Sequence, residues 1–291
     1  MNDPTPDSED YLRAHLKDPI DYLYPHKLAF DFSNTPLYWK DNSPFKSFFE
    51  NAFSIALPLL EDFMIKASLE AKDKIQDENL AAQVDAFCAQ EDNHARAHEA
   101  FNNHLKSNGF DVDKYTNKWV KIVKKLNEKS LNDRLLASAL IEAMTSVIGK
   151  FYFKNTPYEV IDPAVHKLLS WHCLEELEHR CIVFDLYKNQ ASPYNPSFRK
   201  TFGFSFTFFT TTMLIMFDSL IKKKSFFKFQ TLKDFYWLMK PTGPLIAFLT
   251  GYIHFLNKKY DPRKLFDEEE LNNIIKTWEE KYQHKLGETY K

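Results

Sequence analysis

The sequence predicts an all-α fold, and three observations support that prediction. From residue 43 onward, apolar residues recur three and four positions apart almost throughout, which is the period of a helix face. Two long helices begin with a capping Ser or Asp followed directly by proline. No segment shows the alternation typical of a β-strand, and no internal repeat is present. We therefore expect one domain, with an extended N-terminal arm over 1–42, a helical bundle over 43–192 and a C-terminal helical extension over 193–291.

The first two long helices have clear starts and ends. Ser43 is the expected N-cap of the first helix, with Pro44 in its first position. Pro58 inside that helix predicts a kink, because proline removes a backbone donor and crowds the preceding turn. The second helix is expected over about 77–106. It should stop at Gly109, since glycine adopts the left-handed conformation that ends many helices.

Two further long helices follow a short amphipathic one. The amphipathic helix is expected over 114–130, and the third long helix over about 132–153. The fourth has Asp162 as its cap and Pro163 in its first position, and is expected to continue as one helix until just before Pro193.

The region after residue 196 has a different composition. Two uncharged segments, 201–217 and 241–256, are each shorter than the roughly 20 apolar residues of a membrane-spanning helix. A basic and aromatic stretch, KKKSFFKFQTLKDFYWLMK, separates them, and an amphipathic helix is expected over 267–286. The uncharged segments are expected either to cover one end of the bundle or to make peripheral membrane contact through 201–256.

The overall composition excludes several classes of protein. The 38 basic and 40 acidic side chains leave a net charge of −2, which argues against nucleic-acid binding. The chain has 6 glycines and no glycine-rich phosphate motif, so a nucleotide site is not expected. The 3 cysteines form no CxxC pair, which indicates free thiols in a reducing compartment. The N-terminus is polar and acidic, unlike a signal peptide. These features predict a cytoplasmic location, with or without membrane association.

The most specific signal is a set of ionisable residues inside two apolar helix stripes. Side chains three and four positions apart lie on one side of a helix, so each set converges on one point. Burying an unpaired carboxylate is costly, whereas a bound cation accepts ionised carboxylates and neutral imidazoles directly. The stripes therefore predict a buried metal site. The residues that interrupt them are Glu91, His94 and His98 in the second helix and His172, Glu176 and His179 in the fourth.

The other two long helices each add one isolated acid. Glu61 lies in the apolar segment IALPLLEDFMI, and Glu142 in LLASALIEAMTSVIGKF. A di-metal carboxylate bundle takes two Glu-x-x-His segments and one glutamate from each of two further helices, and this chain offers that full set in order. The small residues beside Glu142 are expected to leave room for a substrate; they are Ala139, Thr145, Ser146 and Gly149.

These motifs together resemble the ferritin-like di-iron superfamily. More narrowly, LPLLE, QEDNH and WHCLEELEH resemble a bacterial family of predicted metal-dependent hydrolases, over roughly residues 25–190. The resemblance implies a ferritin-like four-helix bundle with a dinuclear metal site and additional C-terminal helices. It does not imply hydrolysis, because the same ligand set supports other reactions.

The spacing between His172, Glu176 and His179 is also similar to that of di-iron arylamine N-oxygenases, in which a third histidine is a ligand. Either Glu175 or Glu176 can bridge two ions. The predicted metal ligands are Glu61, Glu91, His94, Glu142, His172, Glu176 and His179. Further candidates, as ligands or as groups that orient them, are His98, Glu175, Gln90 and Asp185.

The donor types favour one reaction class. Carboxylates and imidazoles without thiolate suit two iron ions, or iron with manganese. The expected function is a non-haem di-iron oxidase or oxygenase, which uses O2 to oxidise a small apolar or amphipathic molecule. The alternatives are a dinuclear metal-dependent hydrolase of an ester or phosphoester, and a non-catalytic helical binding protein stabilised by its metal. Expected partners are a lipophilic small molecule, an external electron donor and, in a homodimer, a second copy of the chain.

Overall fold

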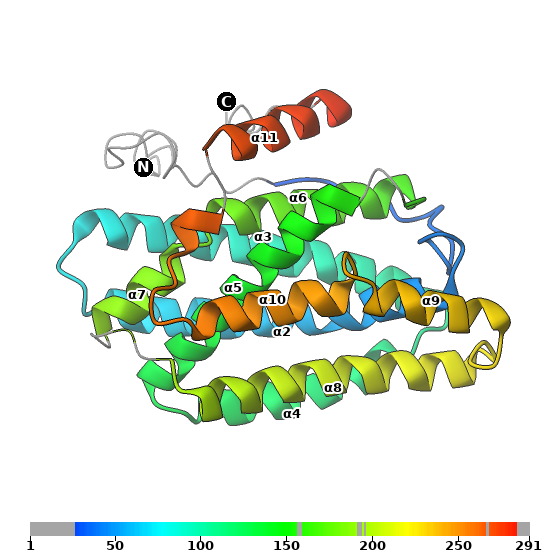
Figure 1. Cartoon of the computed structure of the whole chain (residues 1–291), viewed down its shortest axis with the longest axis horizontal. Helices are drawn as coiled ribbons and strands as arrows, with labels where there is room; N and C mark the ends of the chain where they lie inside the picture. The colour runs from blue at the N-terminus through cyan, green and yellow to red at the C-terminus, as the bar shows by residue number, and fades with distance from the viewer. Residues whose placement is uncertain (1–26, 156–158, 191–193, 195, 266–267, 284–291) are drawn as a thin grey trace, which may run out of the picture.

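A computed structural model describes residues 27–155, 159–190, 194, 196–265 and 268–283. These residues are almost entirely helical, and their one β-feature is an isolated antiparallel bridge between Lys40 and Ile161. The all-α prediction is confirmed. Figure 1 shows α2 (Pro44–Lys72), α3 (Glu78–Ser107) and α8 (Phe198–Lys222) running along the long axis of the molecule, with α5 (Leu131–Asn155) inclined across them.

Four long helices surround the interior that holds the predicted ligands. They are α2 (Pro44–Lys72), α3 (Glu78–Ser107), α5 (Leu131–Asn155) and α6 (Pro163–Glu178). Helix α2 packs against α3 and α5, and α6 also contacts both α3 and α5, which closes a ring of four helices. Each helix therefore turns one face toward a shared core.

The helix starts follow the local signals in the sequence. Ser43 Oγ accepts a hydrogen bond from the Lys46 backbone N–H at 3.1 Å, and Asp162 caps α6 through two backbone N–H groups. Gly109 follows the end of α3 with a φ of +74°, the left-handed conformation expected there. Helix α2 continues through Pro58 without a break.

The fourth predicted helix is interrupted, which corrects the expectation of a continuous one. Helix α6 ends at Glu178, and a separate helix α7 (Ile182–Gln190) follows. Between them lies Arg180, which is buried and donates hydrogen bonds to the carbonyl oxygens of Leu177 and Pro262. No proline or glycine marks this break, and Arg180 within it contacts a distant part of the chain at Pro262.

The small residues beside Glu142 mainly allow α5 and α6 to approach each other. Ser146 Oγ donates to the backbone carbonyl of Glu176 on α6, at 3.2 Å. A Cβ atom at Gly149 would lie 3.0 Å from the carbonyl oxygen of Cys173, so the close packing there favours glycine. Of the four small residues expected to leave room for a substrate, only Thr145 lines the cavity described below.

The remaining helices cover this ring. Helix α8 packs against α2 and α5, α10 against α5, and α11 against α6. Helices α4 and α8 lie side by side along the lower edge of Figure 1, where the ring centroids of Trp119 and Phe208 are 5.4 Å apart. The bounds are α4 (Val112–Asn127), α8 (Phe198–Lys222), α9 (Phe229–Met239), α10 (Pro244–Leu256), a 3-10 turn η3 (Pro262–Leu265) and α11 (Glu268–Tyr282).

Two of the described helices, α5 and α8, are long and apolar enough to cross a membrane by length and composition. Helix α8 passes this test because it extends beyond the uncharged segment 201–217 at both ends. Helix α5 is a core helix, since 67% of its apolar window is buried inside the protein. The corresponding value for α8 is 44%, because its inner face packs against the core and its outer face is exposed.

Candidate metal centre

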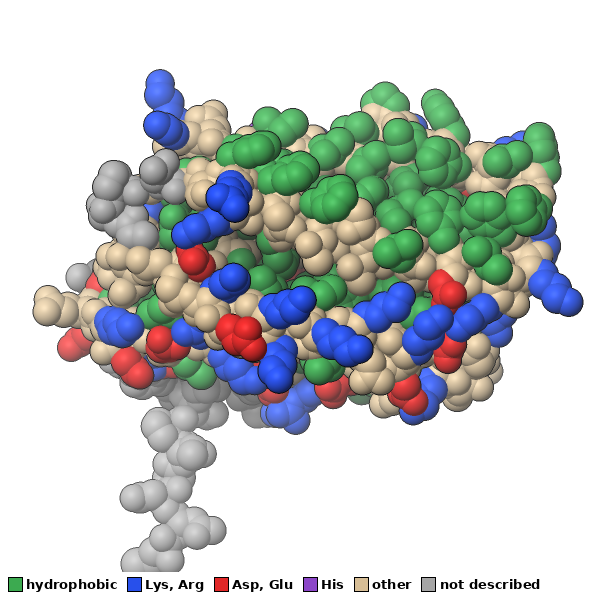
Figure 2. Space-filling model, turned by 90° about the horizontal axis from the view of Figure 1, so that it is seen from below, with side chains coloured by type: hydrophobic (Ala, Val, Ile, Leu, Met, Phe, Trp, Pro, Cys, Tyr) green, Lys and Arg blue, Asp and Glu red, His purple; other side chains and the backbone are tan. Residues whose placement is uncertain are grey.

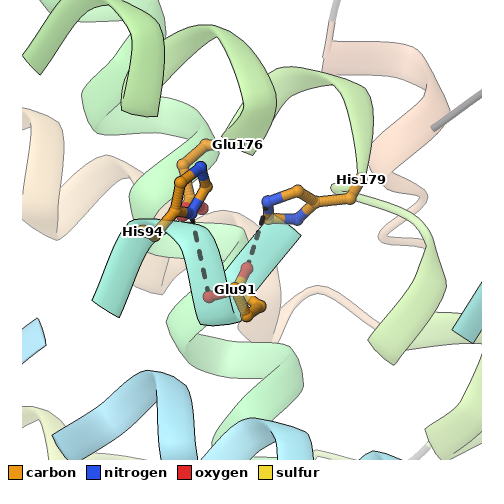
Figure 3. A group of neighbouring side chains, drawn as sticks. All are labelled: Glu91, His94, Glu176 and His179. Atoms are coloured by element: carbon orange, nitrogen blue, oxygen red, sulfur yellow. Dashed lines mark ion pairs between the residues drawn. The ribbon is translucent and has the colours of Figure 1, made fainter. Parts of the chain in front are cut away.

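The structure brings the predicted carboxylate and imidazole ligands together in the interior. None of the seven residues is more than 6% exposed, although all are ionisable. Figure 3 shows four of them pointing toward one another from α3 and from the C-terminal end of α6. The seven are Glu61, Glu91, His94, Glu142, His172, Glu176 and His179.

Six of these residues fall into two adjoining groups of potential donor atoms. Within each group, one donor atom from every residue lies within 4.8 Å of the others. The first group is Glu91, His94, Glu176 and His179, and the second is Glu61, His94 and His172. Because His94 belongs to both, the two groups adjoin, and its neutral ring can bind a cation in one of them.

The electrostatics of the cluster fit a bound cation. Both carboxylate oxygens of Glu61 and Oε1 of Glu142 are buried, and no hydrogen bond from the described residues reaches them. Burial, with repulsion from neighbouring carboxylates, raises the pKa of Glu61 and of Glu91 well above the usual range. Cations between these groups would remove both the desolvation cost and the repulsion.

Glu142 lies against His179 and in neither donor group. Its Oε2 is 2.8 Å from His179 Nδ1, while His179 Nε2 faces Glu91 Oε1 at 3.1 Å. Burial opposes charge on this imidazole, but Glu142 and Glu176 more than offset it and raise its pKa. Ligand histidines commonly bind a carboxylate through their second nitrogen. The position of Glu142 therefore suits orientation of His179 as well as direct ligation.

The adjacent glutamates 175 and 176 have different surroundings. Glu175 is buried between two side chains: Trp171 Nε1 donates to its Oε1 at 2.7 Å, and His94 Nε2 lies 2.9 Å from its Oε2. Nδ1 of His94 is then the nitrogen that faces Glu91, at 3.9 Å (Figure 3). Glu176 belongs to the first donor group. The geometry thus places Glu176 among the potential donor atoms and Glu175 against His94.

A chain of hydrogen bonds leads away from His172. Its Nδ1 is 3.0 Å from Nε2 of His98, and His98 Nδ1 is 2.9 Å from Ser54 Oγ. The Ser54 hydroxyl donates to Asn102 Oδ1 at 2.9 Å, and Asn102 Nδ2 donates back to the Ser54 carbonyl. All four residues are buried.

This chain fixes the proton on each imidazole. Because the Ser54 hydroxyl donates to Asn102, it accepts from His98 Nδ1, which must carry the proton. His98 Nε2 then accepts from His172 Nδ1, and Nε2 of His172 keeps a lone pair that faces the cluster. Burial, aided by His172, lowers the pKa of His98 well below its usual value, so the ring is neutral. His98 is therefore placed to orient His172 and lies in neither donor group.

The last two candidates, Gln90 and Asp185, contact residues that belong to neither donor group. Gln90 is buried, and its Nε2 donates to Glu178 Oε2 at 3.2 Å. Asp185, on α7, forms an ion pair with Arg263 and belongs to neither donor group.

A cavity of about 160 Å³ adjoins the cluster. Three residues of the centre line it, namely His98, His172 and Glu176, and most of the remaining wall is apolar. Its aromatic lining includes Phe53 from α2, Phe208 from α8 and Phe248 from α10.

A second polar group, which no sequence pattern had indicated, also lines this cavity. Lys40 is 2% exposed and lies between two carboxylates, Glu50 and Glu159, the latter at 2.9 Å. Trp237 donates to Glu159 and stacks near the Lys40 ammonium group. Lys40 is the only lysine or arginine among the described residues that line the cavity, and its charge is already paired.

Fold and site together define a class: helical proteins with a buried, carboxylate- and histidine-rich cluster able to hold metal. The chain matches the sequence profile of the predicted metal-dependent hydrolases over residues 24–265, and it belongs to that family. The match extends past residue 190 and so includes α8, α9 and α10. Comparisons with curated proteins and with solved structures gave no match. The wider resemblance to ferritin-like di-iron proteins stays a prediction.

Proposed function

We propose that the protein is a hydrolase that uses two metal ions to cleave a carboxylic ester with an apolar acyl chain. The observation that carries this proposal is the apolar cavity whose wall includes His172 and Glu176. A substrate chain can occupy the cavity while its ester group reaches the cluster. Membership of the family of predicted metal-dependent hydrolases supports the same reaction class.

The charges around the cavity favour a carboxylic ester over a phosphoester. The one cationic side chain in the described lining, Lys40, is already paired with Glu50 and Glu159, so a phosphate group would have only the metal ions to neutralise its charge. A neutral ester carries no such charge, so its transfer into this site costs less.

The roles of the protein residues follow from their contacts. Metal ions bound here would activate a water molecule and polarise the ester carbonyl. Glu61, Glu91, Glu176 and the three histidines of the donor groups would hold them. Glu142, Glu175 and His98 keep the ring nitrogens directed toward the cluster. The apolar walls exclude bulk water, which strengthens every electrostatic interaction in the site.

A di-iron oxidase or oxygenase is the second candidate, and the donor set favours it. The carboxylates and imidazoles of the cluster suit iron or manganese. No cysteine belongs to either donor group, so the described cluster offers no thiolate ligand. Such an enzyme would require O2 and an external electron donor, and the same cavity would hold its apolar substrate.

One reconstitution experiment separates these functions. The full chain is stripped with chelator, loaded with Mn²⁺, Zn²⁺ or, without air, Fe²⁺, and assayed with p-nitrophenyl esters of increasing acyl length. Metal-dependent hydrolysis that increases with acyl length supports the proposal. Oxygen uptake by the Fe²⁺ form without hydrolysis under any metal would favour the oxygenase. Metal binding with neither activity would favour a non-catalytic binding protein.

A further inference from the structure

The outer faces of α8, α9 and α10 carry an extended apolar surface. Outside residues 198–253, the described part of the chain exposes only three large hydrophobic side chains, Leu69, Val120 and Val160. Figure 2 shows the resulting cluster of hydrophobic side chains on one face of the molecule. We call the exposed hydrophobic side chains of 198–253 the α8–α10 face; Phe202, Phe206, Phe227, Leu232 and Ile253 are examples.

The side chains of this face are well exposed to solvent. Phe227 is 93% exposed, Phe229 71% and Leu232 68%. Along α8, Phe198, Phe202 and Phe206 stack at successive turns with ring centroids 5.5 and 5.8 Å apart, so they form an ordered aromatic row. Exposed apolar surface that is this continuous marks a site of association rather than ordinary protein surface.

The same segment is strongly basic. Residues 198–256 contain eight basic and two acidic side chains, a net charge of +6 in a chain whose total is −2. Both acids are already paired: Asp218 is partly exposed and pairs with Lys114 and Lys222, and Asp234 is buried and accepts from Gln230. Lysines 224, 228 and 233 are exposed, and so is Lys222, which also pairs with Asp111.

We propose that the α8–α10 face docks on the surface of a bilayer that contains anionic phospholipid. Aromatic and aliphatic side chains enter the boundary between headgroups and acyl chains, and lysines bind the anionic headgroups. A second copy of this chain fits less well, because a symmetric contact would bring two like-charged faces together. The contact is peripheral, since the inner face of α8 packs against α2.

Docking also gives the cavity a source of substrate, an extension that rests on the proposed function. Phe208, Trp237 and Phe248 line the cavity from the inner sides of α8, α9 and α10, the helices whose outer sides form the proposed contact. A lipid ester can then move from the bilayer between these helices to the cluster without crossing water.

Co-sedimentation of the full chain with vesicles tests the docking. The vesicles contain either phosphatidylcholine alone or phosphatidylcholine with phosphatidylglycerol. Two variants alter the α8–α10 face, Phe202→Ser with Phe206→Ser, and Lys228→Glu with Lys233→Glu. The charge-matched control, Lys264→Glu with Lys276→Glu, changes exposed lysines on η3 and α11. All substituted side chains are exposed, and thermal unfolding confirms that each variant is folded.

Wild type and control are expected to bind the anionic vesicles, and both variants of the face about tenfold or more weakly. Salt should weaken binding of the wild type. No binding by wild type, or equal binding by all variants, would overturn the docking. A second contradicting outcome is dimerisation through this face. In that case the wild type would be a dimer in sedimentation velocity and would not bind vesicles, and the Phe202→Ser, Phe206→Ser variant would be a monomer. A Glu61→Ala variant is expected to bind vesicles normally, so loss of hydrolysis there leaves the docking result independent.

Discussion

His98 Nε2 lies 3.0 Å from His172 Nδ1, and Asn102, through Ser54, decides which of the two rings carries the proton between them. The direction of this hydrogen bond leaves the lone pair of His172 Nε2 facing the cluster, 3.0 Å from Glu176 Oε1, where a cation would bind both atoms. His98, which lies outside both donor groups, thereby determines which nitrogen of His172 faces the cluster.

Replacing His98 with alanine is predicted to weaken the binding of one metal ion about 10–100-fold, because His172 loses the partner that sets its orientation. Ser54→Ala should cause a smaller loss in the same direction. Competition with a metallochromic chelator measures both. His104→Ala, on the same helix α3 but bonded to the backbone of Thr35, is the control. Equal affinities in wild type and His98→Ala would contradict the orienting role.

The different surroundings of the adjacent glutamates predict different losses. Glu176→Ala should reduce the number of ions bound, since Glu176 belongs to a donor group. Glu175→Gln should keep that number but weaken affinity about 10–100-fold, because it acts through His94. Metal analysis with affinity titration distinguishes the two. Reduced stoichiometry in Glu175→Gln with normal stoichiometry in Glu176→Ala would reverse the assignment.

The metal-free protein is predicted to lose stability as pH rises from about 4.5 to about 7. Burial raises the pKa of Glu142 from 4.5 to about 7, so between these values the folded protein holds a proton that the unfolded chain releases. The raised pKa values of Glu61 and Glu91 act in the same direction. Glu176, whose pKa is lowered, acts in the opposite direction only at lower pH. The lowered pKa values of His98 and His166 oppose the trend up to about pH 6.5, and the raised values of Glu178 and His179 add to it.

Urea unfolding of chelator-treated protein at pH 5 and pH 7.5 measures this dependence. Metal-loaded protein is the comparison, and there the trend should weaken or reverse, because the ions take the place of the protons. A metal-free protein that is more stable at pH 7.5 than at pH 5 would show that these carboxyls are not protonated as described.

Glu61→Gln is predicted to stabilise the metal-free protein while it weakens metal binding. The amide keeps the shape of the side chain but has no charge to bury, so the free energy of unfolding at pH 7 should rise by roughly 1–3 kcal/mol. The neighbouring Asp62→Asn, which changes an exposed ion pair with Lys66, should shift it by less than about 0.5 kcal/mol. A destabilised Glu61→Gln variant would mean that Glu61 is satisfied without metal.

Partial filling of the cavity should change substrate preference. Ala247, on α10, is 1% exposed and lines the cavity, so Ala247→Leu should shorten the space for an acyl chain. We expect kcat/KM for long-chain esters to fall about tenfold or more and that for acetate esters to change little. Ala164→Leu on α6, outside the lining, is the control. An equal loss for all chain lengths would place the substrate elsewhere.

Local signals made much of the fold predictable. Ser43 and Asp162 begin their helices through caps that use only the following few residues, and Gly109 ends α3 in the same local way. The break after Glu178 was not predictable, because Arg180 is held by the carbonyl of Pro262, far along the chain.

The candidate site likewise has features that the sequence could predict and features that it could not. Helical spacing identified which acids and histidines share a face, and the structure buries all of them. Spacing could not show which ring nitrogen faces the centre, because that depends on partners from other helices, such as Ser54 for His98. A signal was available in Asn102, four residues after His98 on the same helix face. No such signal marked Lys40, since neither of its carboxylate partners, Glu50 and Glu159, lies within a helical turn of it in the sequence.

The number of metal ions bound per chain tests the central claim most directly. The full chain is stripped with chelator, reloaded with Mn²⁺ or with Fe²⁺ in the absence of air, desalted and analysed by inductively coupled plasma mass spectrometry. We predict about two ions per chain for wild type and a lower number for His94→Ala, since His94 lies where the two donor groups adjoin. Trace metal in wild type, or unchanged stoichiometry in His94→Ala, would contradict a dinuclear centre at this cluster.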